Sequence, residues 1–187
     1  ADNIGNNTSI NSISNILLSE KLIDTKPAVQ TVQSYVSTLL EAYIFYEIKR
    51  FDIKGKEYLK TLGKYYIVDI GLRNYLLGFR NRDIGHIIEN IVYFELLRRG
   101  YDVAIGKIGE NEIDFIATNI NTKIYIQVTE NMANSNTRER ELAPFYKIKD
   151  NFEKIGITND ESYLGIQDGI KIIRLVDFLL DKKILKN

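Results

Sequence analysis

Residues 111–129 read Asn-Glu-Ile-Asp-Phe-Ile-Ala-Thr-Asn-Ile-Asn-Thr-Lys-Ile-Tyr-Ile-Gln-Val-Thr, and this stretch decides the fold of the segment around it. It contains two runs in which apolar residues alternate with others, separated by the polar residues 119–122. A period of two is typical of β-strands, and a short polar connection between two such runs predicts a hairpin. We therefore expect two antiparallel strands with one apolar side and one polar side.

The polar side of this predicted hairpin carries Asp114 from the first strand and Gln127 and Thr129 from the second. A metal-dependent nuclease of this layout would have a carboxylate at position 127 and a lysine at position 129. Mg²⁺ prefers anionic oxygen ligands, and the attacking water needs a cation or a base beside it. Both positions are neutral here, so the pattern indicates a nuclease scaffold that lacks part of its chemistry. The alternative interpretation is that Asp114 and Gln127 are ordinary half-exposed strand residues.

A helix is predicted for residues 84–99, because apolar residues recur at helical spacing until Gly100, a residue that favours a helix end. Glu89 lies on the flank of the apolar stripe and can approach the hairpin, whereas Glu95 falls in its middle and should be buried. Glu89 and Asp114 are thus candidate metal ligands, and with Gln127 they form the candidate catalytic set. Mg²⁺ is the cofactor that an active site of this kind would use. His86, the only histidine, is expected to make local hydrogen bonds.

The segment after residue 100 continues with strands and one long helix. The predicted elements are strands near 101–105, 112–117 and 123–129, an exposed loop at 131–136, a helix near 137–155 that Pro144 starts or interrupts, and a final strand and helix within 170–180. The order helix, three strands, helix, strand is that of an α/β module of about 100 residues.

The segment before residue 78 has a different order of elements. The predicted elements are helices at 9–19 and 28–42, a strand at 43–51, a turn at 52–56, strands at 57–59 and 64–68, and a short helix at 71–77. Helix, helix, strand, turn, strand is the order of a winged helix-turn-helix whose first helix is cut short. Asp69 is interpreted as the cap of the short helix, with a metal ligand as the alternative. We therefore predict two domains, 1–78 and 79–187, in an α/β (α+β) fold.

Composition limits the function classes. The 25 Lys and Arg balance the 25 Asp and Glu, so only a local patch can attract nucleic acid. The chain has no Cys, no apolar run of membrane-spanning length and no signal peptide, which favours a soluble, cytoplasmic protein with no membrane partner. The polar beginning without Met indicates a fragment of a longer protein, and the sequence contains no phosphate-binding loop of its own.

Four separate motifs carry a resemblance to a known family. They are the run from Glu89 to Val103, the run from Gly109 to Ile116, Ile124-Tyr-Ile-Gln-Val128, and Arg140-Glu-Leu-Ala-Pro-Phe145. Together they resemble the C-terminal region of uncharacterised archaeal and bacterial AAA-type P-loop ATPases. In that family the ATPase is followed by a winged helix and a restriction-endonuclease-like domain of the PD-(D/E)xK superfamily. The resemblance implies a mixed sheet flanked by helices, and an ATPase domain as the partner outside this chain.

The resemblance also assigns site positions. By similarity to archaeal Holliday-junction resolvases, Glu89 is the helix carboxylate, Asp114 the metal-binding aspartate, Gln127 the second ligand position and Thr129 the lysine position. Two of these groups are changed, and each such group typically contributes several kcal/mol to catalysis. We therefore expect a non-catalytic module that binds DNA or a protein. The alternatives are an active Mg²⁺-dependent DNA endonuclease, with Lys107 or Lys123 as a migrated lysine, and a structural or oligomerisation module of the ATPase.

The predicted wing is locally basic. Its candidate nucleic-acid contacts are Lys49, Arg50, Lys54, Lys56 and Lys60, with Lys64 beyond them, against only Asp52 and Glu57. The second helix contributes polar side chains but no Arg to read guanine. A solvated wing without a partner is the alternative. Tyr35, Tyr43, Tyr65 and Tyr66 fall at predicted core or strand positions, so their presence does not require base stacking.

Overall fold

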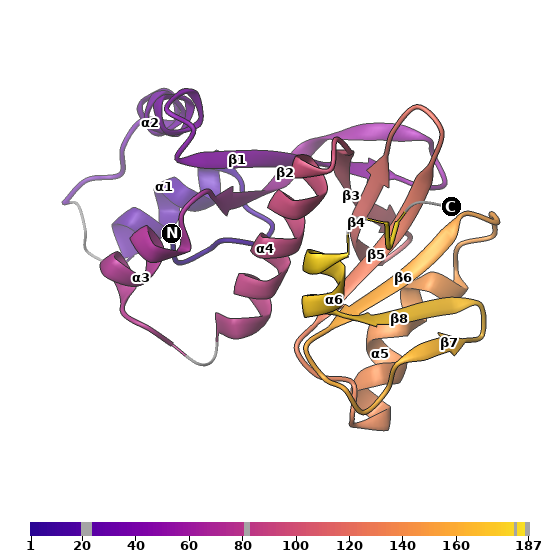
Figure 1. Cartoon of the computed structure of the whole chain (residues 1–187). Helices are drawn as coiled ribbons and strands as arrows, with labels where there is room; N and C mark the ends of the chain where they lie inside the picture. Colours follow the sequence, from indigo (N-terminus) through magenta and orange to yellow (C-terminus); the bar gives the residue numbers. More distant parts are fainter. Residues whose placement is uncertain (20–23, 81–82, 182, 186–187) are drawn as a thin grey trace. The chain divides into compact units, whose positions relative to one another are not determined.

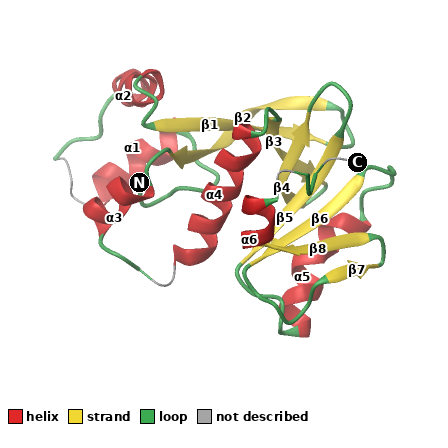
Figure 2. Ribbon diagram, viewed as in Figure 1, coloured by secondary structure: helices red, strands yellow, loops and turns green. Residues whose placement is uncertain are grey.

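The computed structural model describes residues 1–19, 24–80, 83–181 and 183–185, and within these ranges helices and strands form a mixed α/β architecture (Figures 1 and 2). The chain divides into two compact units. The first unit comprises residues 1–49 and 59–79, and the second comprises 50–58 and 80–187. The predicted domains, 1–78 and 79–187, differ from these units at residue 79, which belongs to the first unit, and at residues 50–58, which belong to the second.

The first unit contains α1 (Ile10–Ser19), α2 (Val29–Glu41), the start of β1 (Phe45–Asp52), most of β2 (Glu57–Ile67) and α3 (Ile70–Leu77). The two strands predicted at 57–59 and 64–68 are one strand, which bends at Leu62, where φ is 62°. A Cβ atom at Gly63 would lie 2.9 Å from the carbonyl oxygen of Ile48, so only glycine allows β2 to approach β1 this closely. Ile4, Val32, Ile48, Tyr66 and Ile67 form the buried interior.

Asp69 caps α3, as the sequence predicted. Its Oδ1 accepts the backbone N–H groups of Gly71 (2.6 Å) and Leu72 (3.1 Å), which satisfies two donors that have no partner within the helix. Two other predictions for this unit are wrong. Tyr35 in α2 and Tyr43 before β1 are 68% and 67% exposed, so neither occupies the core or strand position predicted for it. Lys64 is only 5% exposed, which removes it from the basic surface.

The second unit contains the remaining elements. They are α4 (Ile84–Arg98), β3 (Asp102–Ile108), β4 (Asn111–Thr118), β5 (Lys123–Thr129), α5 (Ser135–Tyr146), β6 (Glu153–Thr158), β7 (Gly165–Gln167), β8 (Ile170–Arg174) and α6 (Leu175–Leu180). Its sheet has the strand order β1-β3-β4-β5-β6-β8-β7. β4 runs antiparallel to both of its neighbours, β3 and β5, whereas β6 runs parallel to β5 and β8 runs parallel to β6.

The end of β1 is part of this sheet. Arg50–Asp52 pair in parallel register with Ile105–Lys107 of β3. Parallel pairing of this kind depends on residues more than 50 positions apart, so no local sequence pattern predicts it. The tip of the predicted wing is therefore part of the second unit, where it pairs with the sheet.

Helices lie on both faces of this sheet. Tyr93 of α4 stacks on Phe115 of β4, with ring centroids 6.1 Å apart. Leu142 and Phe145 of α5 instead pack with Ile116 and Tyr125, whose side chains point to the other face. Figure 1 shows α4 and α6 on one side of the sheet and α5 on the other.

The predicted helix at 137–155 is wrong in its second half. α5 ends at Tyr146, just after Pro144, and residues 153–158 form strand β6. Proline removes a backbone donor and so weakens the end of the helix, while the β-branched residues of β6 suit a buried strand. The short strand β7 was also missed. Among the described helices, none has both the length and the apolar character needed to cross a bilayer.

Candidate functional site

The β4–β5 hairpin forms as the sequence predicted. Paired residues run from Phe115 and Ile126 to Thr118 and Lys123. The loop between the strands is closed by Asn119, whose Oδ1 accepts hydrogen bonds from the backbone N–H groups of Asn121 (3.0 Å) and Thr122 (2.8 Å). This side-chain turn fixes the register that brings Asp114 opposite Gln127 at the other end of the hairpin.

Asp114 and Gln127 join the two strands through their side chains. Asp114 Oδ2 accepts the backbone N–H of Val128 at 2.8 Å, and Gln127 Oε1 accepts the backbone N–H of Asp114 at 3.3 Å. Each side chain thus contacts the backbone of the opposite strand, just beyond the last paired residues. One carboxylate oxygen of Asp114 and the amide oxygen of Gln127 are thus each used to satisfy a backbone donor.

Gln127 also meets a carboxylate from helix α5. Its Nε2 lies 3.5 Å from Oε2 of Glu141, at the limit of a hydrogen bond, and Arg140 pairs with the other oxygen of Glu141 at 2.8 Å. Gln127 is only 7% exposed, so this polar group lies under the helix. The amide therefore connects the hairpin to α5, because it accepts a hydrogen bond from the strand and offers one to the helix.

Glu89 approaches the sheet from the other helix layer. It is buried on α4, whereas Gln127 points toward α5 on the opposite face. Its Oε2 lies 4.0 Å from Nδ1 of His86, one turn earlier on the same helix, which is too long for the local hydrogen bond predicted for His86. The structure thus joins Asp114 to Gln127 and brings Glu141 of α5 to the Gln127 amide, while Glu89 belongs to helix α4.

The surroundings do not fit a carboxylate-rich magnesium site. Within the described ranges, no three His, Cys, Asp or Glu side chains gather closely enough to hold a metal ion. Mg²⁺ demands near-octahedral oxygen ligation, and two of the candidate oxygens already accept backbone hydrogen bonds.

Thr129, which stands where the resemblance expects a lysine, makes a hydrogen bond to the loop that follows β5. Thr129 is 9% exposed, and its hydroxyl donates to the carbonyl oxygen of Asn131 at 3.3 Å. Lys123, one possible migrated lysine, lies four residues before Gln127 on β5, about 13 Å along the strand. It contacts Asp150 at 3.8 Å instead. Lys107, the other one, is half-buried on β3 in register with Glu112 of β4.

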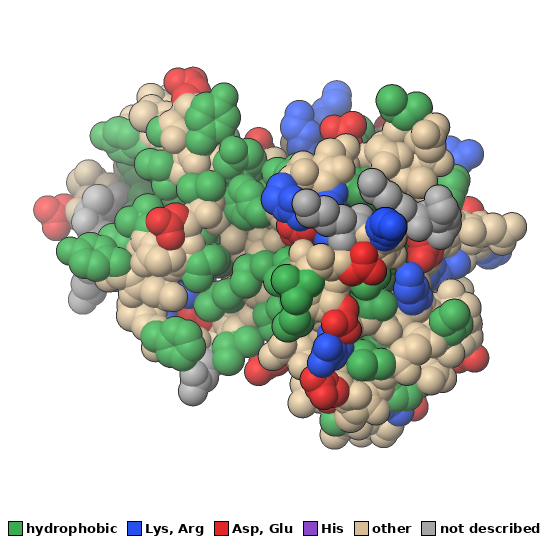
Figure 3. All heavy atoms as spheres, viewed as in Figure 1, with side chains coloured by type: hydrophobic (Ala, Val, Ile, Leu, Met, Phe, Trp, Pro, Cys, Tyr) green, Lys and Arg blue, Asp and Glu red, His purple; other side chains and the backbone are tan. Residues whose placement is uncertain are grey.

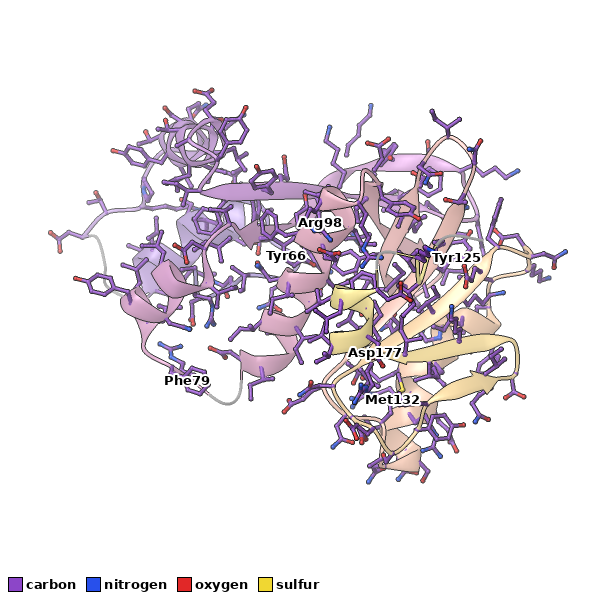
Figure 4. All side chains as sticks on the ribbon, in the orientation of Figure 1. Tyr66, Phe79, Arg98, Tyr125, Met132 and Asp177 are labelled. Carbon is purple, nitrogen blue, oxygen red and sulfur yellow. The ribbon has the colours of Figure 1, made fainter. Side chains whose placement is uncertain are left out.

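Glu95 is buried on α4, as its place in the apolar stripe predicted. Arg98 Nε and Arg99 Nε donate to its carboxylate at 2.7 and 2.6 Å. Burial alone would raise the pKa of Glu95, but the hydrogen bonds and positive charges of Arg98 and Arg99 outweigh this effect and hold it below its ordinary value. Arg98, labelled in Figure 4, is largely exposed, whereas Arg99 is buried and also donates to the carbonyl oxygens of Phe178 and Asp181. Glu95 therefore joins the end of α4 to the end of α6.

The predicted nucleic-acid contacts differ in their environment. Lys49, Lys54, Lys56 and Lys60 are exposed. Arg50 is largely buried and lies 3.8 Å from Glu112 of β4. The exposed lysines therefore keep their charges at the surface, whereas Arg50 has a structural partner.

Two residues, Glu141 and Tyr58, were not predicted as site residues from the sequence, although the structure places them beside the candidate residues. Glu141 stands in the Arg140–Phe145 motif, next to the core residue Leu142, and helical periodicity could have placed it beside the sheet. Tyr58 lies two residues after Lys56 of the basic turn, and the residue is 58% exposed. An aromatic residue between lysines is a recognisable signal for nucleic-acid binding, but its exposure is settled only by the fold.

Comparison with known proteins gives matches without an established function. Residues 1–83 match the family described as Domain of unknown function (DUF8612). An uncharacterized protein of Haemophilus influenzae is 42% identical over 180 residues, covering 96% of this chain and 44% of that protein. "Uncharacterized protein MJ1544" of Methanocaldococcus jannaschii is 31% identical over 185 residues, covering 92% of this chain and 40% of that protein. The chain thus spans less than half the length of these relatives, and no solved structure matches it.

Proposed function

We propose that this chain is a non-catalytic DNA-binding module whose second unit is a degenerate restriction-endonuclease-like domain. The observation that carries the proposal is the exchange between Asp114 and Gln127. Each side chain accepts a backbone N–H of the opposite strand, so both groups hold the hairpin together. A group that satisfies a buried donor is retained for stability even when no chemistry requires it.

The order of elements in the second unit supports a restriction-endonuclease-like fold. Its core runs α4, β3, β4, β5, α5, β6, with three antiparallel strands followed by a strand parallel to the third. This order agrees with the restriction-endonuclease-like domain that the sequence resemblance implies. The order α1, α2, β1, β2 similarly supports a winged helix for the first unit.

The chemistry of the site supports a module that does not cleave. A neutral amide at position 127 attracts a divalent cation less than a carboxylate does, and Thr129 provides no positive charge for a developing phosphorane. The nearby Glu141 is the one observation that favours the alternative, an active Mg²⁺-dependent nuclease. It brings a carboxylate to within 3.5 Å of the amide nitrogen that replaces the usual ligand.

The turn between β1 and β2 is the proposed DNA contact. Lys54 and Lys56 are exposed on either side of Gly55, where phosphate groups can approach them. Helix α2, which would read bases in a winged helix, has no Lys or Arg and exposes Tyr35 and Leu39. In Figure 3 the surface over the helices of the first unit is mostly green and tan. The proposed contact is therefore the turn rather than the helix.

We also propose that the module belongs to a longer cytoplasmic protein with an ATPase domain. Support comes from the resemblance to AAA-type ATPases and from the length of the relatives, which leaves room in them for a further domain. ATP-driven motion would then act on the DNA that the module holds.

The test measures binding and cleavage separately. Binding of labelled DNA is followed by fluorescence anisotropy at salt concentrations from about 50 to 200 mM, and cleavage is assayed with Mg²⁺ and with Mn²⁺. We expect binding without cleavage. Lys54→Gln combined with Lys56→Gln should weaken binding and reduce the slope of log affinity against log salt by about 1.4 to 1.8. The matched control is the double variant Lys149→Gln and Lys183→Gln, which changes two exposed lysines elsewhere in the second unit and should leave DNA affinity unchanged.

Two outcomes would contradict the proposal. Cleavage that is lost in Asp114→Asn would identify an active nuclease. Affinity that is equal in wild type and in the Lys54 and Lys56 double variant would exclude the turn as the contact and shift the function toward a protein partner or a structural role.

A further inference from the structure

The turn between β1 and β2 has a well-defined backbone. Asp52 Oδ1 accepts the N–H groups of Lys54 (3.0 Å) and Gly55 (3.2 Å), and the Asp52 carbonyl oxygen accepts the N–H of Lys56 at 2.8 Å. Three hydrogen bonds to one residue fix the path of the chain. The lysine side chains therefore start from a fixed backbone, which reduces the entropy that binding would cost.

The base of this turn is attached to the sheet of the second unit. Beyond the paired residues of β1 and β3, Ile53 N–H donates to the carbonyl oxygen of Lys107 at 2.9 Å. The contact between Arg50 and Glu112 links the same strand to β4. The turn is thus supported on rigid strands, which is the arrangement that positions binding groups most accurately.

Tyr58 adds an aromatic ring to the same turn. It packs edge-to-face with Phe51, with ring centroids 5.2 Å apart and the planes at 73°. In spite of this contact, 58% of the residue is exposed. Phe51 therefore orients the ring while leaving much of it accessible to a flat ligand.

The charges around the ring are mainly positive. Lys54 and Lys56 lie four and two residues before Tyr58, and both are exposed. Of the two acids in this segment, Asp52 accepts hydrogen bonds from the turn, and only Glu57 is exposed. An exposed aromatic ring beside cations fits a ligand that combines flat bases with phosphates.

We propose that this turn binds single-stranded DNA, with Tyr58 stacked on an unpaired base and with Lys54 and Lys56 paired to the flanking phosphates. The proposal rests on the proposed function, since it concerns the same lysines, and it specifies the kind of DNA. A duplex would use only the lysines, because its bases are already stacked on one another and their faces are not available. A single strand offers those faces, so the tyrosine ring adds to its affinity alone.

The experiment compares two probes on the full chain. Fluorescence anisotropy is measured with a labelled oligo-dT strand and with a duplex of equal length. Tyr58→Ala should weaken binding of the single strand by about 5- to 100-fold, which corresponds to one lost stacking contact, and change binding of the duplex less than about twofold. Tyr58→Phe keeps the ring and should bind the single strand nearly as wild type does. Tyr146→Ala removes another tyrosine of this unit that is also 58% exposed, and should leave both affinities unchanged.

The outcomes separate this inference from the proposed function. If Tyr58→Ala weakens neither probe, or both equally, stacking on a single strand is wrong even when the lysines still matter. If the Lys54 and Lys56 double variant binds as wild type does, the proposed function fails as well. Should Tyr58→Ala lower the melting temperature, Tyr58→Leu is used in its place, because leucine keeps an apolar contact with Phe51 but has no aromatic face. Loss of single-strand affinity in Tyr58→Leu would support the inference, and retention would overturn it.

Discussion

The β4–β5 hairpin and the turn between β1 and β2 each contain an aspartate whose carboxylate accepts backbone N–H groups. Asp114 accepts the N–H of Val128 on the neighbouring strand, and Asp52 accepts two N–H groups within its own turn. Around Asp114 the neighbouring polar groups are Gln127 and Glu141, beneath helix α5. Around Asp52 they are exposed lysines.

This difference shows how surroundings change the use of the same residue type. In the hairpin, polar side chains satisfy one another and the backbone, so little is left with which to bind a ligand. In the turn, the aspartate satisfies the backbone and leaves the lysine charges at the surface. The hairpin aspartate thus contributes to stability, whereas the turn presents the exposed lysines that the proposed DNA contact needs.

The largest effect on stability is expected at Glu95, a carboxylate that is buried on α4. Glu95→Gln removes the charge that compensates the buried Arg99, and should lower the free energy of unfolding by about 3 kcal/mol. Because the pKa of Glu95 is depressed in the folded state, its contribution is complete above the ordinary value of 4.5 and is lost as the pH falls through the lower folded-state pKa. Urea unfolding of both proteins at several pH values measures this. A difference that stays constant down to pH values of about 2 would contradict it.

Asp114→Ala should have the next largest effect. The substitution leaves the backbone N–H of Val128 without its acceptor and should cost about 1 to 3 kcal/mol of stability. Asp114→Asn retains an oxygen acceptor and should cost clearly less. Thermal unfolding followed by circular dichroism compares the two variants. Equal stability of Asp114→Ala and wild type would show that the hairpin does not depend on this contact.

Gln127→Glu should create a repulsive pair with Glu141. We expect a loss of about 1 kcal/mol in the free energy of unfolding at neutral pH. Glu141→Gln in the same background removes the repulsion and should restore stability, so a double-mutant cycle isolates the interaction. A loss that is unchanged by the second substitution would mean that the two side chains do not interact.

Asp52→Ala should have the smallest effect on stability, about 0.5 to 1 kcal/mol, because the turn is exposed and water can replace the lost acceptor. It should still weaken DNA binding by severalfold if the turn must be preorganised. Asp52→Asn keeps the side-chain acceptor and should bind nearly as wild type does. If Asp52→Ala bound DNA as tightly as wild type, preorganisation of the lysines would not contribute.

Much of the local structure was predictable from the sequence. The alternation of apolar residues predicted both strands of the β4–β5 hairpin, and their helical spacing predicted α4 and the burial of Glu95. The failures have two causes. The helix predicted for 137–155 ran through Pro144 into a buried strand, because a short apolar run fits either element. The burial of Lys64 depends on how β2 packs, and this packing cannot be predicted from the residues next to Lys64 in the sequence.

The sequence by itself determined the elements whose signals lie within a few residues, such as the cap at Asp69 and the turns at Asp52 and Asn119. It also placed Asp114 and Gln127 on the two strands of one hairpin. Only the tertiary structure decided that Glu141 meets Gln127, that α4 and α5 cover opposite faces, and that the end of β1 pairs with β3. These contacts join residues that are distant in sequence, and they are fixed by the packing of whole elements rather than by any local preference.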